Sequence, residues 1–157
     1  MASNAGMQAL TSPRSIDEAK RQLQAAGYRG ERGVFMAPTD FAAINAMSLV
    51  TGDLLRRIGF NVDYQALDWG TLAQRWNSRQ PVEQGGWSAF CTFTTAAATA
   101  TPADNKFIRG IGERGLMGWP DSTDIERHRT AFLDATDPAA QRAACAALQE
   151  AAFRDVP

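Results

Sequence analysis

Apolar positions recur with helical or strand periods along most of the chain, and these periods predict its first elements. Residues 16–26 have an apolar face at helical spacing. Ser15 and Glu18 have the spacing of a capping box, and Gly27 is suited to end the helix. The short apolar run 34–37 then predicts a buried strand.

A second helix and a second strand follow directly. Asp40 is expected to open a longer helix that Gly59 closes, because apolar residues between them recur at helical spacing. Residues 60–67 then alternate apolar and polar side chains, which predicts a half-buried strand. Strand, helix and strand in this order indicate a right-handed βαβ unit with two parallel strands.

The remaining segments complete an α/β architecture, a small and mainly parallel sheet flanked by helices. Asp68 is expected to cap a short helix, and residues 84–94 to hold a third strand that runs into a loop. An ordered loop or weak helix start is predicted at 95–100, a helix starting at Thr101-Pro102, and a glycine-broken loop at 110–120. Two final helices are expected to start at Asp121 or Ser122 and at Asp137.

Composition excludes several classes of protein. The 157 residues correspond to one domain or a piece of one, and 45% of them are hydrophobic. A net charge of −1 shows no excess of positive charge to attract nucleic acid, so no nucleic-acid partner is expected. No apolar run has the length of a membrane-spanning helix. Two cysteines and one histidine do not suffice for a zinc cluster or a disulfide framework.

No catalytic, metal or cofactor site is predicted. His128 lies in a charged helical stretch, which a solvated helix face explains. The glycines of 110–115 follow a helix pattern where a phosphate loop would follow a strand. Cys91 and Cys145 have no histidine or acid at a suitable spacing. They fit small buried side chains better, and a disulfide between them stays open.

An aromatic cluster is the most informative group of side chains. Trp69, Trp76, Trp87, Phe90 and Phe93 lie close together in the sequence, around the two later predicted strands. Ligands of open α/β sheets bind beyond the carboxyl ends of strands, so these rings are candidates for a ligand wall. Core packing is the alternative: we favour it for Trp76, and Trp87 fits either role.

Five short motifs in the correct order resemble the extracytoplasmic solute-binding proteins of ABC importers, in the dipeptide/oligopeptide-binding class (family 5). The segments are 16–28 (IDEAKRQLQAAGY), 54–67 (LLRRIGFNVDYQAL), 68–72 (DWGTL), the Gly-Trp pair at 86–87, and 137–157 (DPAAQRAACAALQEAAFRDVP). The resemblance extends over nearly all of the chain after its small, polar start.

The resemblance implies a fold of two lobes that close on a ligand, and a periplasmic location. Residues 11–157 would be an incomplete C-terminal lobe, and residues 1–10 an appended leader or a disordered segment. The implied partners are a small-molecule or peptide ligand, ABC permease subunits and the missing N-terminal lobe of the same chain. A second copy could also bind to apolar surface exposed by the truncation.

The sequence departs from the peptide-binding pattern at two positions. Phe90 stands where peptide-binding members usually carry an aspartate for the ligand's ammonium group. Pro38 or Thr39 stands where dipeptide-selective members place an arginine. A buried ligand charge without a partner is costly, so zwitterionic dipeptides held by these anchors are not expected. A modified peptide, or another solute held by stacking and backbone hydrogen bonds, fits better.

The resulting prediction is a non-enzymatic binding lobe of an importer receptor. The alternatives are a small α/β enzyme of unknown reaction and a self-associating interaction module. The residues expected to face the ligand are Thr39, Asp40, Trp69, Trp87, Ser88 and Phe90.

Overall fold

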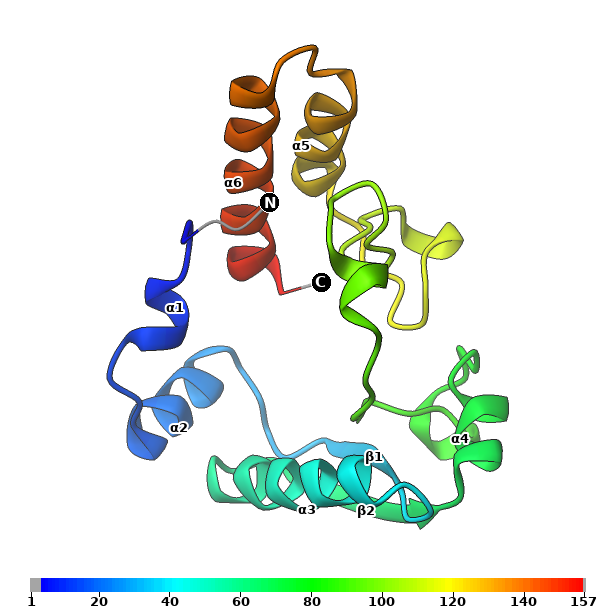
Figure 1. Cartoon of the computed structure of the whole chain (residues 1–157). Coiled ribbons are helices and arrows are strands. Elements are labelled where there is room, and N and C mark those ends of the chain that lie inside the picture. The colour runs from blue at the N-terminus through cyan, green and yellow to red at the C-terminus, as the bar shows by residue number, and fades with distance from the viewer. Residues whose placement is uncertain (1–3, 157) are drawn as a thin grey trace. The chain divides into compact units, whose positions relative to one another are not determined.

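The computed structural model describes residues 4–156 and divides the chain into two compact units (Figure 1). One unit is Pro13–Phe93, and the other combines residues up to Ser12 with those from Thr94 onward. Each unit is described by itself. In the described part of the chain, none of the helices is both long enough and apolar enough to cross a membrane.

The unit Pro13–Phe93 is built on a parallel three-stranded sheet. Its strands are β1 (Arg32–Pro38), β2 (Asn61–Leu67) and β3 (Ala89–Phe90), in the order β2-β1-β3. The register of β1 and β2 runs from Arg32 opposite Asn61 to Pro38 opposite Leu67. The predicted α/β class and the parallel βαβ pairing are therefore confirmed. The central strand β1 is buried from Val34 to Pro38, as a strand covered on both faces must be.

Helices flank this sheet, and their caps agree with the sequence pattern. They are α2 (Ile16–Ala25), α3 (Ala42–Arg57), α4 (Trp69–Arg75) and a 3-10 turn, Val82–Gln84. The Ser15 hydroxyl accepts the Glu18 N–H at 3.3 Å. Gly27 and Gly59 end their helices with positive φ angles of 86° and 105°, which glycine tolerates best.

The two faces of β1 pack against different helices. Val34 and Met36, which point to the same face, form a fully buried cluster with Leu72 of α4. Phe35 points to the other face, where its ring stacks on Tyr64 at 5.7 Å. Tyr64 in turn lies under Gly52 of α3, where an added Cβ would come within 2.9 Å of its ring. The α4 face of the sheet and the α3 face are therefore chemically separate environments.

The other unit contains a helical hairpin. Its elements are α1 (Gln8–Thr11), α5 (Thr123–Asp134), α6 (Pro138–Asp155) and two 3-10 turns, Ala96–Thr99 and Gly112–Arg114. Ser122 caps α5 by accepting the Ile125 N–H, and Asp137 caps α6 by accepting two N–H groups. Both helix starts are as predicted.

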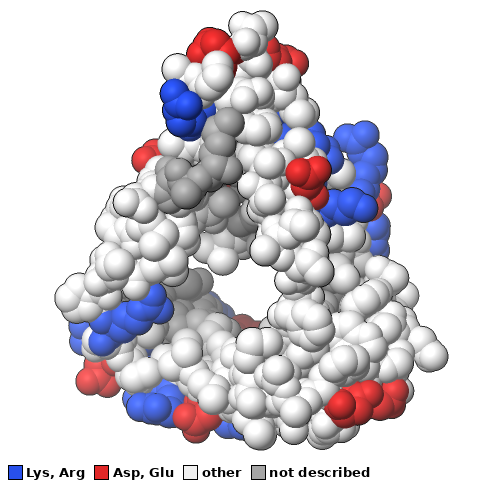
Figure 2. Space-filling view, viewed as in Figure 1, with Lys and Arg blue, Asp and Glu red and all other residues white. Residues whose placement is uncertain are grey.

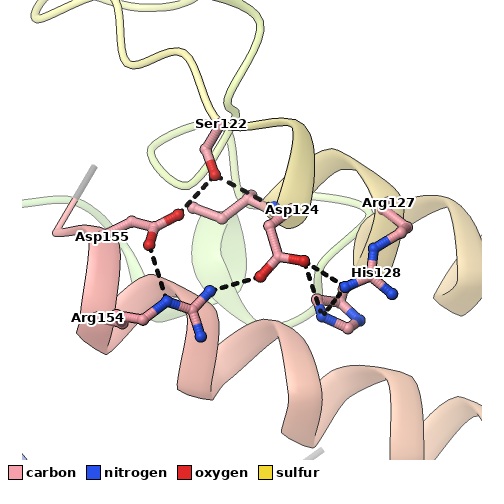
Figure 3. Close-up of polar contacts among 7 residues, drawn as sticks. Ser122, Asp124, Arg127, His128, Arg154 and Asp155 are labelled. Atoms are coloured by element: carbon pink, nitrogen blue, oxygen red, sulfur yellow. Dashed lines mark hydrogen bonds and ion pairs between the residues drawn. The ribbon is translucent and has the colours of Figure 1, made fainter.

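A polar network ties the start of α5 to the end of α6 (Figure 3). The Asp124 carboxylate binds the guanidinium groups of both Arg127 and Arg154. Arg127 above all holds the pKa of Asp124 below its usual value. The Ser122 hydroxyl donates to Asp155 at 2.6 Å. His128 does not lie on a solvated face as predicted: its side chain is 18% exposed and lies 3.5 Å from Asp124.

Part of the predicted leader contacts α6. The Gln149 side chain donates to the Ala5 carbonyl at 2.7 Å, and Gly6 packs so closely on Phe153 that an added Cβ would lie 2.6 Å from the ring. Residues 1–3 lie outside the described residues. The assignment of residues 1–10 to a leader and of 11–157 to one lobe stays a prediction.

One predicted element is wrong, and another is confirmed but shorter than its predicted range. The helix expected at Thr101 is a single turn, because Thr101 and Asp104 bond each other's side chains and the Asn105 side chain then accepts the Phe107 N–H. The third strand is shortened to Ala89–Phe90, since a 3-10 turn and left-handed Gly85 precede it. Cys91 and Cys145 are both free thiols.

Candidate ligand-binding site

Three of the predicted site residues meet at the carboxyl ends of β1 and β2. The N–H and the hydroxyl of Thr39 donate to the Leu67 carbonyl at 2.9 and 3.3 Å. Both carboxylate oxygens of Asp40 accept the Trp69 N–H, at 2.9 and 3.1 Å. Asp40 therefore binds the first residue of α4. The prediction that Asp40 opens α3 is wrong, because Phe41 is the N-cap of that helix.

A second carboxylate fixes the start of α4. Asp68 accepts the N–H and the hydroxyl of Thr71 at 2.9 and 2.6 Å. These two bonds lower the pKa of Asp68. Asp40 and Asp68 together satisfy N–H groups that a helix start leaves open, and they orient Trp69. Among the described residues, no three His, Cys, Asp or Glu side chains are grouped as a metal ion would require.

Six aromatic rings then form a continuous series, which we call the aromatic row. In order, with the distance between neighbouring ring centroids, it runs from Phe93 to Phe41 (6.4 Å), Trp69 (5.5 Å), Trp76 (5.7 Å), Phe90 (6.4 Å) and Trp87 (5.0 Å). Most of these contacts are edge-on or tilted, the geometries that aromatic rings prefer.

The two ends of the aromatic row differ in exposure. Its inner rings, from Trp69 to Trp87, are partly buried and pack against the core of Val34, Met36 and Leu72. Its outer rings, Phe41 and Phe93, are 43% and 64% exposed. Neighbouring exposed rings are a surface on which a ligand can stack.

The Gly-Trp loop is held in place by α4. The Arg75 guanidinium donates to the Gly85 and Gly86 carbonyls at 3.3 and 3.1 Å, and to the Gln65 side chain at 2.8 Å. The Trp87 indole N–H donates to the Trp76 carbonyl at 3.0 Å. These bonds fix the position of the Trp87 ring at the inner end of the aromatic row.

Ser88 is the one predicted site residue that lies elsewhere. Its hydroxyl accepts the Val34 N–H at 3.1 Å, so this oxygen is engaged with the backbone of β1. Ser88 also lines an apolar pocket of about 190 Å³ on the α3 face, together with Phe35, Leu55 and Phe60. The structure thus joins Thr39, Asp40, Trp69, Phe90 and Trp87 through bonds and ring contacts, and separates Ser88 from them.

Three rings of the aromatic row are missing from the predicted site: Phe93, Phe41 and Trp76, the last of which packs against the core. Phe93 belongs to the aromatic cluster recognised in the sequence, but it lies beyond the predicted ligand loop. Phe41 directly follows Thr39 and Asp40, so its place after the carboxyl end of β1 is the signal that could have identified it.

Comparisons with known proteins agree with this architecture. No protein-family model matches the chain. The chain is 35% identical over 117 residues to a probable peptide ABC transporter periplasmic-binding protein, y4tO, of Sinorhizobium fredii (strain NBRC 101917 / NGR234). The match covers 74% of this chain and 22% of that protein. Over this stretch the chain is homologous to part of a periplasmic-binding protein of an ABC transporter.

The chain also shares the fold of a solved periplasmic binding protein. The periplasmic binding protein MelB of Agrobacterium fabrum C58, solved in complex with stachyose, superposes with a TM-score of 0.67. That match covers 92% of this chain and 25% of MelB, at 12% identity, so it shows the fold alone. The segment spans about a quarter of the length of each relative.

Proposed function

We propose that this chain forms part of a periplasmic receptor that binds peptides or related small solutes for an ABC importer. In this proposal residues 11–157 are one ligand-binding lobe, and an N-terminal lobe of the same polypeptide supplies the opposing wall. The receptor binds and releases its ligand without a chemical reaction. Its relative y4tO is named a probable peptide-binding protein, which supports peptides as the ligand class.

The aromatic row carries this proposal. Its part with Phe41 and Trp69 lies at the carboxyl ends of β1 and β2, where ligands of open α/β sheets bind. Its exposed rings, Phe41 and Phe93, offer apolar faces to a ligand, while the buried rings behind them fix their position. A stacking surface of this kind binds apolar side chains and the flat faces of peptide groups.

The chemistry around the aromatic row argues for a ligand without free charged ends. The Phe90 ring packs between Trp76 and Trp87 at the position where the resemblance implies an aspartate. The two carboxylates nearby, Asp40 and Asp68, already accept N–H groups of α4. Neither carboxylate can therefore turn toward a ligand's ammonium group without giving up its hydrogen bond to α4. Blocked peptides, or the interior of longer ones, avoid that cost.

Ligand binding would act through closure of the two lobes. A ligand that contacts both lobes stabilises the closed state relative to the open one, because the second set of contacts forms only on closure. In the proposed cycle the closed receptor then docks on the permease.

The test is a titration of the 157-residue chain with N-acetylated, C-terminally amidated tetrapeptides that carry apolar side chains, followed by tryptophan fluorescence. We expect weak binding, because one lobe supplies only part of the contacts. Phe93→Ala should weaken it about 3- to 10-fold, the range of one aromatic contact. Phe107→Ala is the matched control, because Phe107 is also exposed, at 40%, but is not part of the aromatic row.

Two results would contradict the proposal. One is the absence of any fluorescence change with every peptide up to about 1 mM, an affinity near 4 kcal/mol. The other is an equal effect of Phe93→Ala and Phe107→Ala. Stachyose, tested in parallel, would redirect the ligand class if it alone bound.

A further inference from the structure

Helix α3 has one side buried against the sheet and, on another side, a stripe of exposed apolar residues. Its inner side, with Ile44, Ser48 and Gly52, is buried against the sheet. The apolar stripe faces away from the sheet and is exposed. It consists of Ala43, Met47, Val50 and Leu54, and the last three are 42%, 71% and 45% exposed. We call these four residues the α3 seam.

The α3 seam has the spacing of a helix-pairing surface. Its positions are separated by four, three and four residues, which is the heptad spacing of a two-helix coiled coil. Figure 2 shows an uncharged stretch along the bottom of the view, where α3 lies, with charged side chains on both sides of it. A continuous apolar stripe on a helix normally packs against another element.

We propose that the α3 seam is an interface with α3 of a second copy of this chain, packed antiparallel about a two-fold axis. The seam is symmetric about the point between Ser48 and Leu49. Antiparallel pairing about that point sets Met47 opposite Val50. It also sets small Ala43 opposite large Leu54, a pairing that fills space without overlap.

Charges at the two ends of α3 favour the same register. Arg57 lies at the C-terminal end of α3, and Asp40 precedes its N-terminal end at the same distance from the symmetry point. Antiparallel pairing therefore brings Arg57 of each copy to Asp40 of the other. Arg57 is 61% exposed and 3.7 Å from Asp53, a loose pair that leaves its guanidinium accessible. Parallel pairing would instead set Arg57 against Arg57.

The dimer should be weak. One pair of helices of 16 residues buries less than the roughly 1,200 Å² of a standard stable interface. Sedimentation velocity over a wide range of protein concentration should show a monomer–dimer equilibrium for the 157-residue chain. Val50→Glu should weaken it at least about 30-fold, or roughly 2 kcal/mol. Leu133→Glu is the matched control, because Leu133 is 49% exposed on α5.

Disulfide trapping tests the orientation. In the proposed register the position of Ala43 in one copy lies about 16 Å along the helices from the same position in the partner, which is too far for a disulfide. Ala43→Cys and Leu54→Cys chains should each fail to crosslink alone and should form a heterodimer when mixed. Oxidised wild type, whose Cys91 and Cys145 are half-buried and buried, gives the background.

Three results would overturn the proposal. A monomer at all concentrations means that no second copy binds, including the case in which another part of the polypeptide covers the α3 seam. Equal weakening by Val50→Glu and Leu133→Glu places the interface elsewhere. Crosslinking of Ala43→Cys with itself and of Leu54→Cys with itself, above the wild-type background, indicates parallel pairing.

Discussion

Replacing Gly86 by alanine tests how tightly the loop before Trp87 is built. Gly86 is buried, and an added Cβ would lie 1.8 Å from the Gln80 carbonyl oxygen and 2.9 Å from the Pro81 carbonyl carbon. Since real Cβ atoms stay beyond 3.0 Å, the oxygen or the loop must move by about 1.2 Å, the difference between 3.0 and 1.8. The movement strains the hydrogen bonds that Gly86 and Gln84 donate to the Pro81 carbonyl.

The expected cost follows from these contacts. Overpacking a tight site costs about 1–3 kcal/mol, and one weakened backbone hydrogen bond adds about 1 kcal/mol. Gly86→Ala should therefore lower the free energy of unfolding of this unit by about 2–4 kcal/mol. Gly33→Ala is the matched control: the nearest atom to its added Cβ is 3.8 Å away, and its φ angle is not positive. It should leave stability unchanged or raise it by up to about 1 kcal/mol.

Urea unfolding followed by tryptophan fluorescence measures both variants. Three of the four tryptophans lie in the unit Pro13–Phe93, so the signal reports mainly on this unit. If Gly86→Ala and Gly33→Ala unfold at the same urea concentration, the close approach of the loop to Gln80 is refuted. A lower midpoint for Gly86→Ala with unchanged Gly33→Ala is the result that the structure requires.

Two further predictions concern charged groups. Arg75→Met removes three donated hydrogen bonds, including those to the Gly-Trp loop, and should destabilise the same unit by about 1–3 kcal/mol in urea unfolding, with Arg75→Lys losing less. Hydrogen bonding to Arg109 lowers the pKa of Glu126 from its usual 4.5, so this stabilisation is present above pH 4.5 and lost as the pH falls through the lowered pKa. Glu126→Gln should flatten that acid-side loss of stability. An unchanged slope between pH 5 and pH 3 (roughly the range in which carboxylates titrate) would contradict the role of this pair.

Local signals in the sequence determined the starts of four helices and the parallel pairing of β1 and β2. Ser15, Asp68, Ser122 and Asp137 each cap the helix that their spacing predicts, because a cap depends on side-chain and backbone atoms only a few residues apart. The parallel pairing of β1 and β2 follows similarly from the βαβ order and the apolar pattern.

Local signals failed where neighbouring polar groups compete. The helix at Thr101 does not continue beyond one turn, because the Asp104 side chain accepts the Thr101 hydroxyl and the Asn105 side chain accepts the Phe107 N–H. These local side-chain bonds compete with the backbone bonds of a longer helix. β3 is short because the Gly85–Gly86 turn comes shortly before it in the chain, so its pairing with β1 starts only at Ala89. Arg75 of α4 holds this turn by donating a hydrogen bond to the Gly85 carbonyl.

The assembly of the candidate site was decided by tertiary structure. The sequence by itself placed aromatic side chains and two acids near the ends of the strands, and it identified Phe90 at a position where an acid was expected. It could not show that Asp40 would bind the start of α4, or that Ser88 would face the opposite side of the sheet from Trp87. These outcomes depend on hydrogen bonds and ring contacts between residues about 30 to 50 positions apart, which form only when the sheet brings its strand ends together.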